Sequence, residues 1–260
     1  MLNPYNTSRF NILPDGSVWI KGTVVTFGGD DIRKAVNGCN VLDVTVGAAG
    51  IETTTFIPGT SSGSLFVRNR LSPRTVKINV EMPLDAAAYA ENLRAVRAWA
   101  YSTEPKDLCL SCYPGKKLSC TCTSISEFSP KTWWGAMEIV FTAWDPRFVD
   151  IVEKSALVGD YFTVKGDDEP LSSLKHTVSE PITGAKWSFD DSTYIKLLDS
   201  KIISSGTVSI DYNNKIVTHD GQSIMSSVAL PSRFPAIQPG QKHIIKGPSG
   251  GVFSWLERWL

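Results

Sequence analysis

The stretch RTVKINVEM, residues 74–82, alternates apolar and polar side chains with a period of two. On an extended chain one face carries Val76, Ile78 and Val80, and the opposite face carries polar side chains. This alternation is typical of an antiparallel strand with one face buried and the other in water. The stretch therefore predicts a β-sheet with a hydrophobic core on one side.

The residues before this stretch add two more predicted strands. IETTTFIPG (51–59) and GSLFVRNR (63–70) are rich in β-branched and aromatic residues. The dipeptide Pro58-Gly59 and the following TSSG are turn-forming residues, so we expect a turn between the two strands.

One segment after the stretch is predicted to be helical. DAAAYAENLRAVRAWAYST (85–103) places Tyr89, Leu93, Val96 and Ala100 at helical spacing, which gives a single apolar stripe. Asp85, which follows Pro83 closely, is an expected N-cap. We expect this helix to cover one face of the sheet.

Four of the five cysteines lie in the next segment, CLSCYPGKKLSCTC (109–122). The segment reads as a β-hairpin with PGK at its turn, which puts Cys120 and Cys122 on one face and Cys109 and Cys112 on opposite faces. A zinc site needs its four ligands to converge. We therefore expect free thiols packed as small apolar residues, with a zinc site and a redox or disulfide role as the alternatives.

The second half of the chain predicts many short strands. AMEIVFTAWDPRF (136–148) is a strand ending at Asp145-Pro146, and we place a domain boundary near 150. VKGDDEPLSS (164–173) reads as an exposed loop. The following turns, spaced every eight to twelve residues, are typical of a β-sandwich.

Two turns and a closing strand are expected in this half. TVSIDYNNKIVTHDGQ (207–222) predicts a two-residue hairpin turn at Asn213-Asn214 and another turn at Asp220-Gly221. RFPAIQPGQKHIIKG (233–247) predicts a proline-containing loop followed by a strand. The tail GVFSWLERWL is expected to be the last strand.

Composition narrows the classes of function. Twenty-six basic residues balance 26 acidic ones, which disfavours nonspecific nucleic-acid binding because that needs a basic surface. The N-terminal MLNPYNTSRF does not resemble a signal peptide, and we find no apolar run long enough for a membrane span. We therefore expect a cytosolic chain with reduced thiols.

We predict no catalytic, cofactor-binding or metal-binding residues in this sequence. We therefore predict that the protein is not an enzyme. The three histidines, His176, His219 and His243, are far apart, and the acidic run at 167–169 lacks the spacing of a calcium loop. Trp187 and Tyr194 near Asp190-Asp191 could stack on and hydrogen-bond a sugar. A core tryptophan is the competing interpretation.

The order of several motifs resembles the distal tail protein family of siphophages, the tail-tip or baseplate hub. These motifs are FIPGTSSGSL, RTVKINVEM, the helix, the hairpin, FTAWDPRF, VSIDYNNKIVTHDGQ, FPAIQPGQKHI and the closing W-x-x-R-W. The resemblance spans nearly the whole chain. Each motif is weak alone, and their order and spacing make the resemblance specific.

The resemblance implies a mainly β, two-domain protein. Residues 1–150 are expected to form a β-sandwich-like belt domain with one α-helix and a β-hairpin, and residues 151–260 a galectin-like or carbohydrate-module-like β-sandwich. Family membership implies a structural virion protein without cofactors. It would act at the tail tip of a long non-contractile phage tail, after assembly in the host bacterial cytoplasm.

The resemblance also implies partners. The belt domains of six copies are expected to close into a hexameric ring that joins the tail tube and tail terminal proteins to a tail-associated lysin or fibre protein. The second domain is expected to carry receptor-binding proteins or to contact host-surface carbohydrate. The alternative function is a carbohydrate-binding adhesion protein that uses the second domain.

Overall fold

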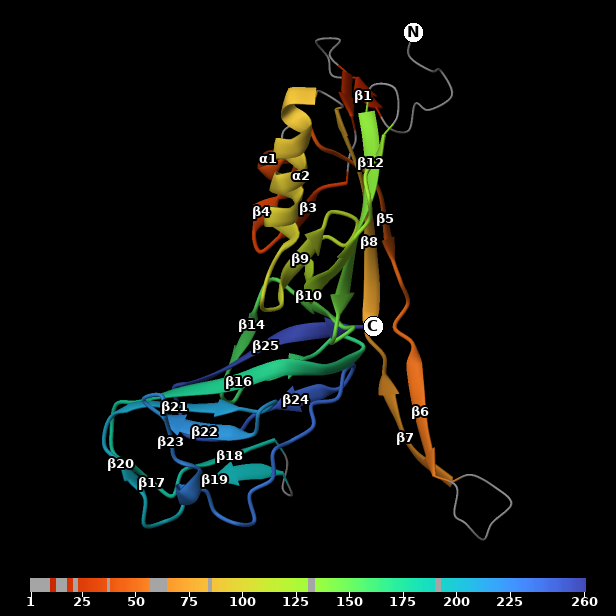
Figure 1. The fold of residues 1–260 in the computed structure, drawn as a ribbon. Helices are drawn as coiled ribbons and strands as arrows, with labels where there is room; N and C mark the ends of the chain where they lie inside the picture. The colour runs from red at the N-terminus through yellow and green to blue at the C-terminus, as the bar shows by residue number, and fades with distance from the viewer. Residues whose placement is uncertain are drawn as a thin grey trace. The chain divides into compact units, whose positions relative to one another are not determined.

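A computed structural model describes residues 10–12, 18–20, 23–36, 38–56, 65–83, 86–130, 134–189 and 193–260. The chain divides into two compact units, Met1–Arg147 and Phe148–Leu260, close to the predicted boundary at 150. Both units are built mainly of strands, which confirms the prediction of a mainly β fold (Figure 1).

The first unit is built on an antiparallel sheet. Its strands lie in the order β5 (Asn40–Val46), β8 (Arg74–Pro83), β12 (Trp134–Ala143), β10 (Lys116–Ile125), β9 (Lys106–Leu110) and β3 (Val25–Phe27). Four further short strands extend it or stand apart from it: β4 (Asp30–Asp31) pairs with β3, β11 (Ser129–Pro130) pairs with β12, and β1 (Phe10–Ile12) pairs with β2 (Val18–Ile20).

Strand β8 is the predicted alternating strand, and it lies inside the sheet between β5 and β12. Val76, Ile78 and Val80 are fully buried, as their spacing predicts. The pairing with β12 runs without a register shift and sets Ile78 opposite Ile139, which is also fully buried. Such cross-strand apolar pairs stabilise the sheet.

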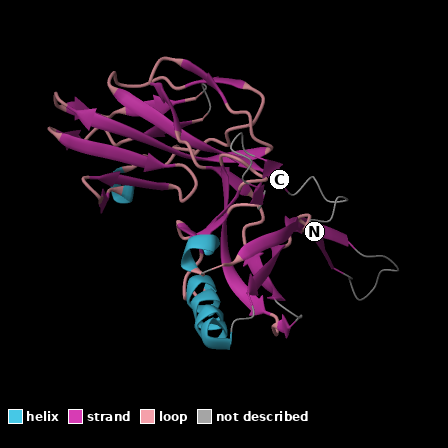
Figure 2. Ribbon diagram, turned by 90° about the horizontal axis from the view of Figure 1, so that it is seen from above, coloured by secondary structure: helices cyan, strands magenta, loops and turns pink. Residues whose placement is uncertain are grey.

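Helix α2 (Ala86–Ala100) covers this sheet, as predicted (Figures 1 and 2). Its buried face contains Val96 and Ala100 of the predicted stripe and also Trp99, which the stripe left out. The Trp99 ring meets Phe27 and Phe141 edge-on, at centroid distances of 5.9 and 5.8 Å. Its indole Nε1 donates to the Asp30 carbonyl oxygen at 2.8 Å, so the helix is anchored by both packing and a hydrogen bond.

Helix α2 is the one helix predicted for residues 1–150, and a four-residue helix, α1 (Ile32–Ala35), lies beside it. The Asp31 carboxylate caps α1 by accepting a hydrogen bond from the Arg33 amide at 3.0 Å. The proposed N-cap of α2, Asp85, lies outside the described residues.

The second unit contains a sheet and several small strand pairs. The sheet order is β23 (Gln222–Ser223), β22 (Ile216–His219), β21 (Gly206–Asp211), β16 (Asp168–Val178) and β25 (Gly251–Trp259), and β25 also pairs with β13 (Phe148–Asp150) and β14 (Lys154–Leu157). The small pairs are β15 (Tyr161–Thr163) with β24 (Lys242–Ile244), β17 (Ile182–Thr183) with β20 (Ile202–Ile203), and β18 (Lys186–Ser188) with β19 (Tyr194–Lys196). A 3-10 turn, η2, spans Met225–Ser227.

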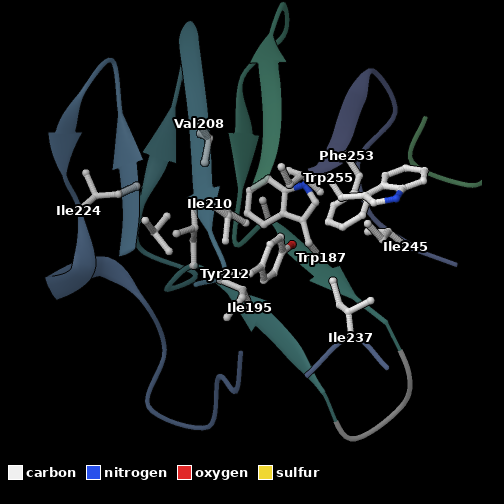
Figure 3. Packing of buried hydrophobic residues seen from close by; sticks show 14 of the residues in the cluster. Trp187, Ile195, Val208, Ile210, Tyr212, Ile224, Ile237, Ile245, Phe253 and Trp255 are labelled. Carbon is white, nitrogen blue, oxygen red and sulfur yellow. The ribbon is translucent and has the colours of Figure 1, made fainter. Parts of the chain in front are cut away.

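The core of this unit lies between the sheet and the small pairs (Figure 3). Trp187 of β18 and Ile195 of β19 pack in the same buried cluster as Ile210 of β21 and Phe253 of β25. All four side chains are at most 1% exposed. The closing strand β25, predicted from the tail GVFSWLERWL, is therefore part of the core.

Two predictions for this unit are wrong. Residues 164–173 are not an exposed loop, because β16 begins at Asp168 and Ser172 is buried. Asn213-Asn214 is not a two-residue left-handed turn, because four residues join β21 to β22 and Lys215 has the positive φ of 57°. The predicted turn at Asp220-Gly221 is confirmed, with φ angles of 47° and 80° that suit a two-residue hairpin.

Candidate assembly surface

Two strands of the first unit form a ribbon of their own. Strand β6 (Ile51–Phe56) and strand β7 (Leu65–Leu71) pair only with each other among the described residues (Figure 1). The ribbon continues β5 and β8 beyond the sheet. At the junction the Gly47 amide donates to the Thr75 carbonyl at 2.8 Å and the Ser72 amide donates to the Gly50 carbonyl at 2.9 Å.

Both faces of this ribbon are exposed. Phe66 lies opposite Thr55, and Phe56 lies opposite Leu65, so the two phenyl rings are on opposite faces. Phe56 is 58% exposed and Phe66 is 63% exposed. The register shift between Thr54 and Thr55 leaves Val67 as the extra residue of a bulge, and Val67 is also exposed.

Few interactions hold the ribbon together. Arg70 donates to the Glu52 carboxylate at 2.7 Å through Nε, and the Thr53 hydroxyl donates to Asn69 Oδ1 at 2.8 Å. Exposed pairs of this kind contribute little to stability, and a two-stranded ribbon without a packed face is only marginally stable in water. The ribbon therefore gains most by packing against another protein surface.

A pocket of about 590 Å³ lies at the base of the ribbon. Ile51 and Leu71 line it from the ribbon, and Trp144 and Pro146 line it from the loop after β12. The Trp144 indole donates to Thr121 Oγ1 at 3.3 Å, yet the side chain stays 61% exposed. An indole held in place and still accessible is a good anchor for a protein partner.

We define the assembly surface as five exposed apolar residues of the ribbon and its base. They are Ile51, Phe56, Phe66, Val67 and Trp144. Exposed aromatic and aliphatic side chains on an unpaired ribbon favour association with another chain, through both side-chain packing and the free strand edges. They offer no acid, base or nucleophile for catalysis.

The four clustered cysteines do not come together. Cys120 points into the core, Cys112 lies exposed in the hairpin turn, and Cys109 and Cys122 are half-buried. All five cysteines are free thiols. Burial raises the pKa of Cys120 and of Cys39 to about 12, as expected for packed thiols. The prediction of packing is wrong for Cys112.

Within the part of the chain that the structure describes, no group of three or more histidine, cysteine, aspartate or glutamate side chains is placed to hold a metal ion. His219 Nε2 donates to the Ser205 carbonyl at 2.8 Å, and His243 Nε2 donates to the Gln238 carbonyl at 2.8 Å. His176 is buried against Trp187. Asp167 accepts a hydrogen bond from the Leu260 amide at 3.2 Å.

The suggested sugar site is not formed by Trp187. Its ring is fully buried and cannot stack on a ligand, so the core interpretation is correct (Figure 3). Tyr194 is partly exposed, but the Lys186 ammonium lies over its ring at 4.1 Å from the centroid. Asp190 and Asp191 lie outside the described residues.

Comparison with known proteins identifies the second unit. Residues 165–259 match the family described as siphovirus-type tail component, C-terminal domain. The second unit is therefore a domain of this family. This tail component is therefore a structural phage protein, and the prediction that it is not an enzyme is confirmed.

The fold of the tail component is also that of a solved structure. The Dit protein of phage SPP1, described as a paradigm of the hub adsorption apparatus in phages that infect Gram-positive bacteria, superposes with a TM-score of 0.78. It is 14% identical, and the match covers 92% of this chain and 99% of SPP1 Dit. The match therefore includes both units.

Two baseplate structures of phage P2, in activated conformations with calcium or strontium, give TM-scores of 0.41 and 0.42 at 10% identity. Each match covers 94% of both chains. No curated protein matches the tail component in sequence. Among the described residues, no helix has the length and apolar character to span a bilayer.

The assembly surface was not predicted from the sequence, although the sequence of its two strands contains one signal of exposure. IETTTF and LFVRNR carry apolar residues at both odd and even positions, unlike the clean alternation of β8. A strand with apolar residues on both faces is either buried on both sides or exposed for a partner. The sequence alone does not distinguish these two cases.

Proposed function

We propose that this tail component is a ring-shaped hub at the tip of a long, non-contractile phage tail. Six copies close around the tail lumen through their first units, as residues 1–150 were expected to do. The ring joins the tail tube and tail terminal proteins on one side to a tail-associated lysin or fibre protein on the other. Assembly takes place in the host cytoplasm.

The β6–β7 ribbon is the observation that carries this proposal. A single chain leaves Phe56 and Phe66 exposed on opposite faces of a ribbon whose strands, among the described residues, pair only with each other. A neighbouring copy in a head-to-tail ring would cover these faces and give the free strand edges a partner. The similarity to SPP1 Dit, described as part of a hub adsorption apparatus, supports this arrangement.

The second unit has a supporting role in the proposal. We infer that it is a galectin-like sandwich that carries receptor-binding proteins. The alternative, a carbohydrate-binding adhesion protein, loses the tryptophan on which it depended, because Trp187 is part of the core. Trp187 therefore cannot serve as a stacking platform for host-surface carbohydrate.

Light scattering and negative-stain images of the same purified fraction test the ring. The proposal predicts a species near six times the 28.5 kDa of one chain, with an open centre. If assembly needs a neighbour, addition of the tail tube protein should produce that species. A chain that stays monomeric at high concentration, and forms no ring with the tube protein, contradicts the proposal.

A further inference from the structure

A second pocket, separate from the assembly surface, lies between α2 and β10 in the first unit. It has a volume of about 650 Å³. One wall contains Arg94 and Arg97 of α2 and Tyr101, which follows the helix, and the other contains Cys122 and Ile125 of β10. None of these residues belongs to the ribbon or to the base of the ribbon.

A bulge in β10 shapes the strand wall. The register with β12 shifts between Cys122 and Ser124, which leaves Thr123 as the extra residue. Thr123 Oγ1 lies 3.0 Å from Thr142 Oγ1, so this residue is held in the bulge. The strand bends at this point, and a hollow remains beside the last turn of α2.

Two arginines give the hollow its charge. Arg94 and Arg97 are three residues apart, so their side chains lie on the same face of α2. Both are exposed, and within the described part of the chain neither forms an ion pair. Two adjacent guanidinium groups without a counter-charge repel each other and attract a carboxylate.

The rest of the hollow is apolar enough to take a hydrophobic side chain. The Tyr101 ring is 71% exposed at the rim, and Ala98 and Ile125 contribute aliphatic surface. A nucleic acid would require a longer stripe of basic residues, and the chain as a whole carries no net charge. A peptide with acidic and apolar residues fits both features.

We propose that this pocket binds an acidic peptide segment of another tail protein, with its carboxylates on Arg94 and Arg97 and an apolar side chain beneath Tyr101. Charge complementarity sets the choice of partner. The pocket would give the hub a docking point for a neighbouring protein that is independent of ring closure. The inference does not require the ring, since every wall residue comes from one chain.

The probe for this site is a fluorescein-labelled peptide of sequence GEFDLEG, with GQFNLQG as its uncharged analogue. Fluorescence anisotropy should show binding of the acidic peptide that is about tenfold weaker for the Arg94→Gln/Arg97→Gln double variant. The matched control Arg68→Gln, which removes an exposed arginine of the ribbon, should bind as the unaltered protein does. Ala98→Trp should block binding by filling the pocket while both arginines remain.

The thiol of Cys122 reports whether the peptide occupies this pocket. Alkylation by N-ethylmaleimide, followed by mass mapping, should slow at Cys122 when the acidic peptide is present and stay constant at Cys112. Equal binding of the uncharged analogue, unchanged binding by the double variant, or no protection of Cys122 would each overturn the proposal. Stronger arginine-dependent binding of a short oligothymidylate would also overturn it, in favour of a nucleic acid. Circular dichroism confirms that each variant is folded.

Discussion

Phe56 and Phe66 lie on opposite faces of the β6–β7 ribbon, and water reaches both rings. A ribbon with one apolar face could fold back on its own sheet. A ribbon with apolar rings on both faces needs a surface on each side, and the described part of one chain does not supply these surfaces. This relationship links the fold of the single chain to its proposed assembly.

Replacing both rings should weaken assembly without unfolding the chain. The Phe56→Ser/Phe66→Ser variant is expected to show a lower average mass in light scattering, because the rings contribute apolar area only when a partner covers them. The free energy of unfolding of the monomer should change by less than about 0.5 kcal/mol, since both positions are exposed. Leu230→Ser, which removes a fully exposed apolar residue of the second unit, is the matched control. An unchanged average mass for the double variant would contradict the claim that the ribbon forms the assembly interface.

The indole of Trp99 should stabilise the first unit. Trp99→Phe is expected to lower the free energy of unfolding by about 1–3 kcal/mol, because it removes the hydrogen bond to the Asp30 carbonyl and leaves a gap beside Phe141. Urea denaturation measures this change. Trp144→Phe is the comparison, and its exposed ring should cost far less. Equal losses for the two variants would contradict the claim that the Trp99 indole anchors the helix.

The buried His176 should make the second unit sensitive to acid. Burial lowers the pKa of His176 below its ordinary value of 6.5, and its Nδ1 has no hydrogen-bond partner among the described residues. The unfolded chain therefore takes up the proton at a higher pH than the folded chain. The contribution of His176 to stability is full above pH 6.5 and is lost as the pH falls toward the folded-state pKa.

The His176→Phe variant isolates this contribution. Its free energy of unfolding should fall less than that of the unaltered protein when the pH is lowered from about 7.5 to about 5. Comparison of the two curves is needed because carboxylates also titrate in acid. Parallel curves for His176→Phe and the unaltered protein would exclude His176 as the cause.

The cysteines should differ sharply in reactivity. At pH 8 a thiol with a pKa of about 12 is ionised in only about one molecule in ten thousand, so Cys39 and Cys120 should react with a disulfide reagent only after unfolding. The exposed Cys112 should react first in the native protein. Metal analysis should find zinc far below one atom per chain. Stoichiometric zinc, or loss of the fold with a chelator, would restore the zinc alternative.

Asn213 should contribute more to stability than its neighbour. Its side-chain oxygen accepts from the Ser172 amide at 2.7 Å, and its side-chain nitrogen donates to the Pro170 carbonyl at 3.0 Å. These bonds satisfy the backbone of β16 near its register irregularity, so Asn213→Ala should cost about 1–3 kcal/mol. Asn214→Ala removes a more exposed contact with Asp211 and should cost less. Thermal or urea unfolding of the two variants decides the order.

The strands could be predicted from local sequence because their periodicity depends only on residues that are neighbours in the chain. The alternation at Val76, Ile78 and Val80 corresponds directly to buried positions of β8, and Asp220-Gly221 marks a real turn. The exposure of Phe56 could not be predicted in the same way. Whether a strand is covered depends on which distant segment lies beside it, and that information is not local.

The same limit explains the errors in the second unit. Trp187 near Tyr194 suggested a ligand platform, but the sheet formed by β21 and β25 encloses the indole. Asn213 was assigned to a left-handed turn, whereas its side chain bonds to a strand far away in sequence. In both cases the residue type indicated a specific role, but the sequence did not show which distant segment the side chain contacts.

Hydrogen–deuterium exchange of the ribbon, in the monomer and in the assembled fraction, tests the central claim most directly. The account predicts rapid exchange of the amides of β6 and β7 in the monomer and strong protection in the assembly, with the core strand β8 protected in both. A ribbon that exchanges equally fast in the two fractions would contradict the account, since the assembly would then be held together by another surface.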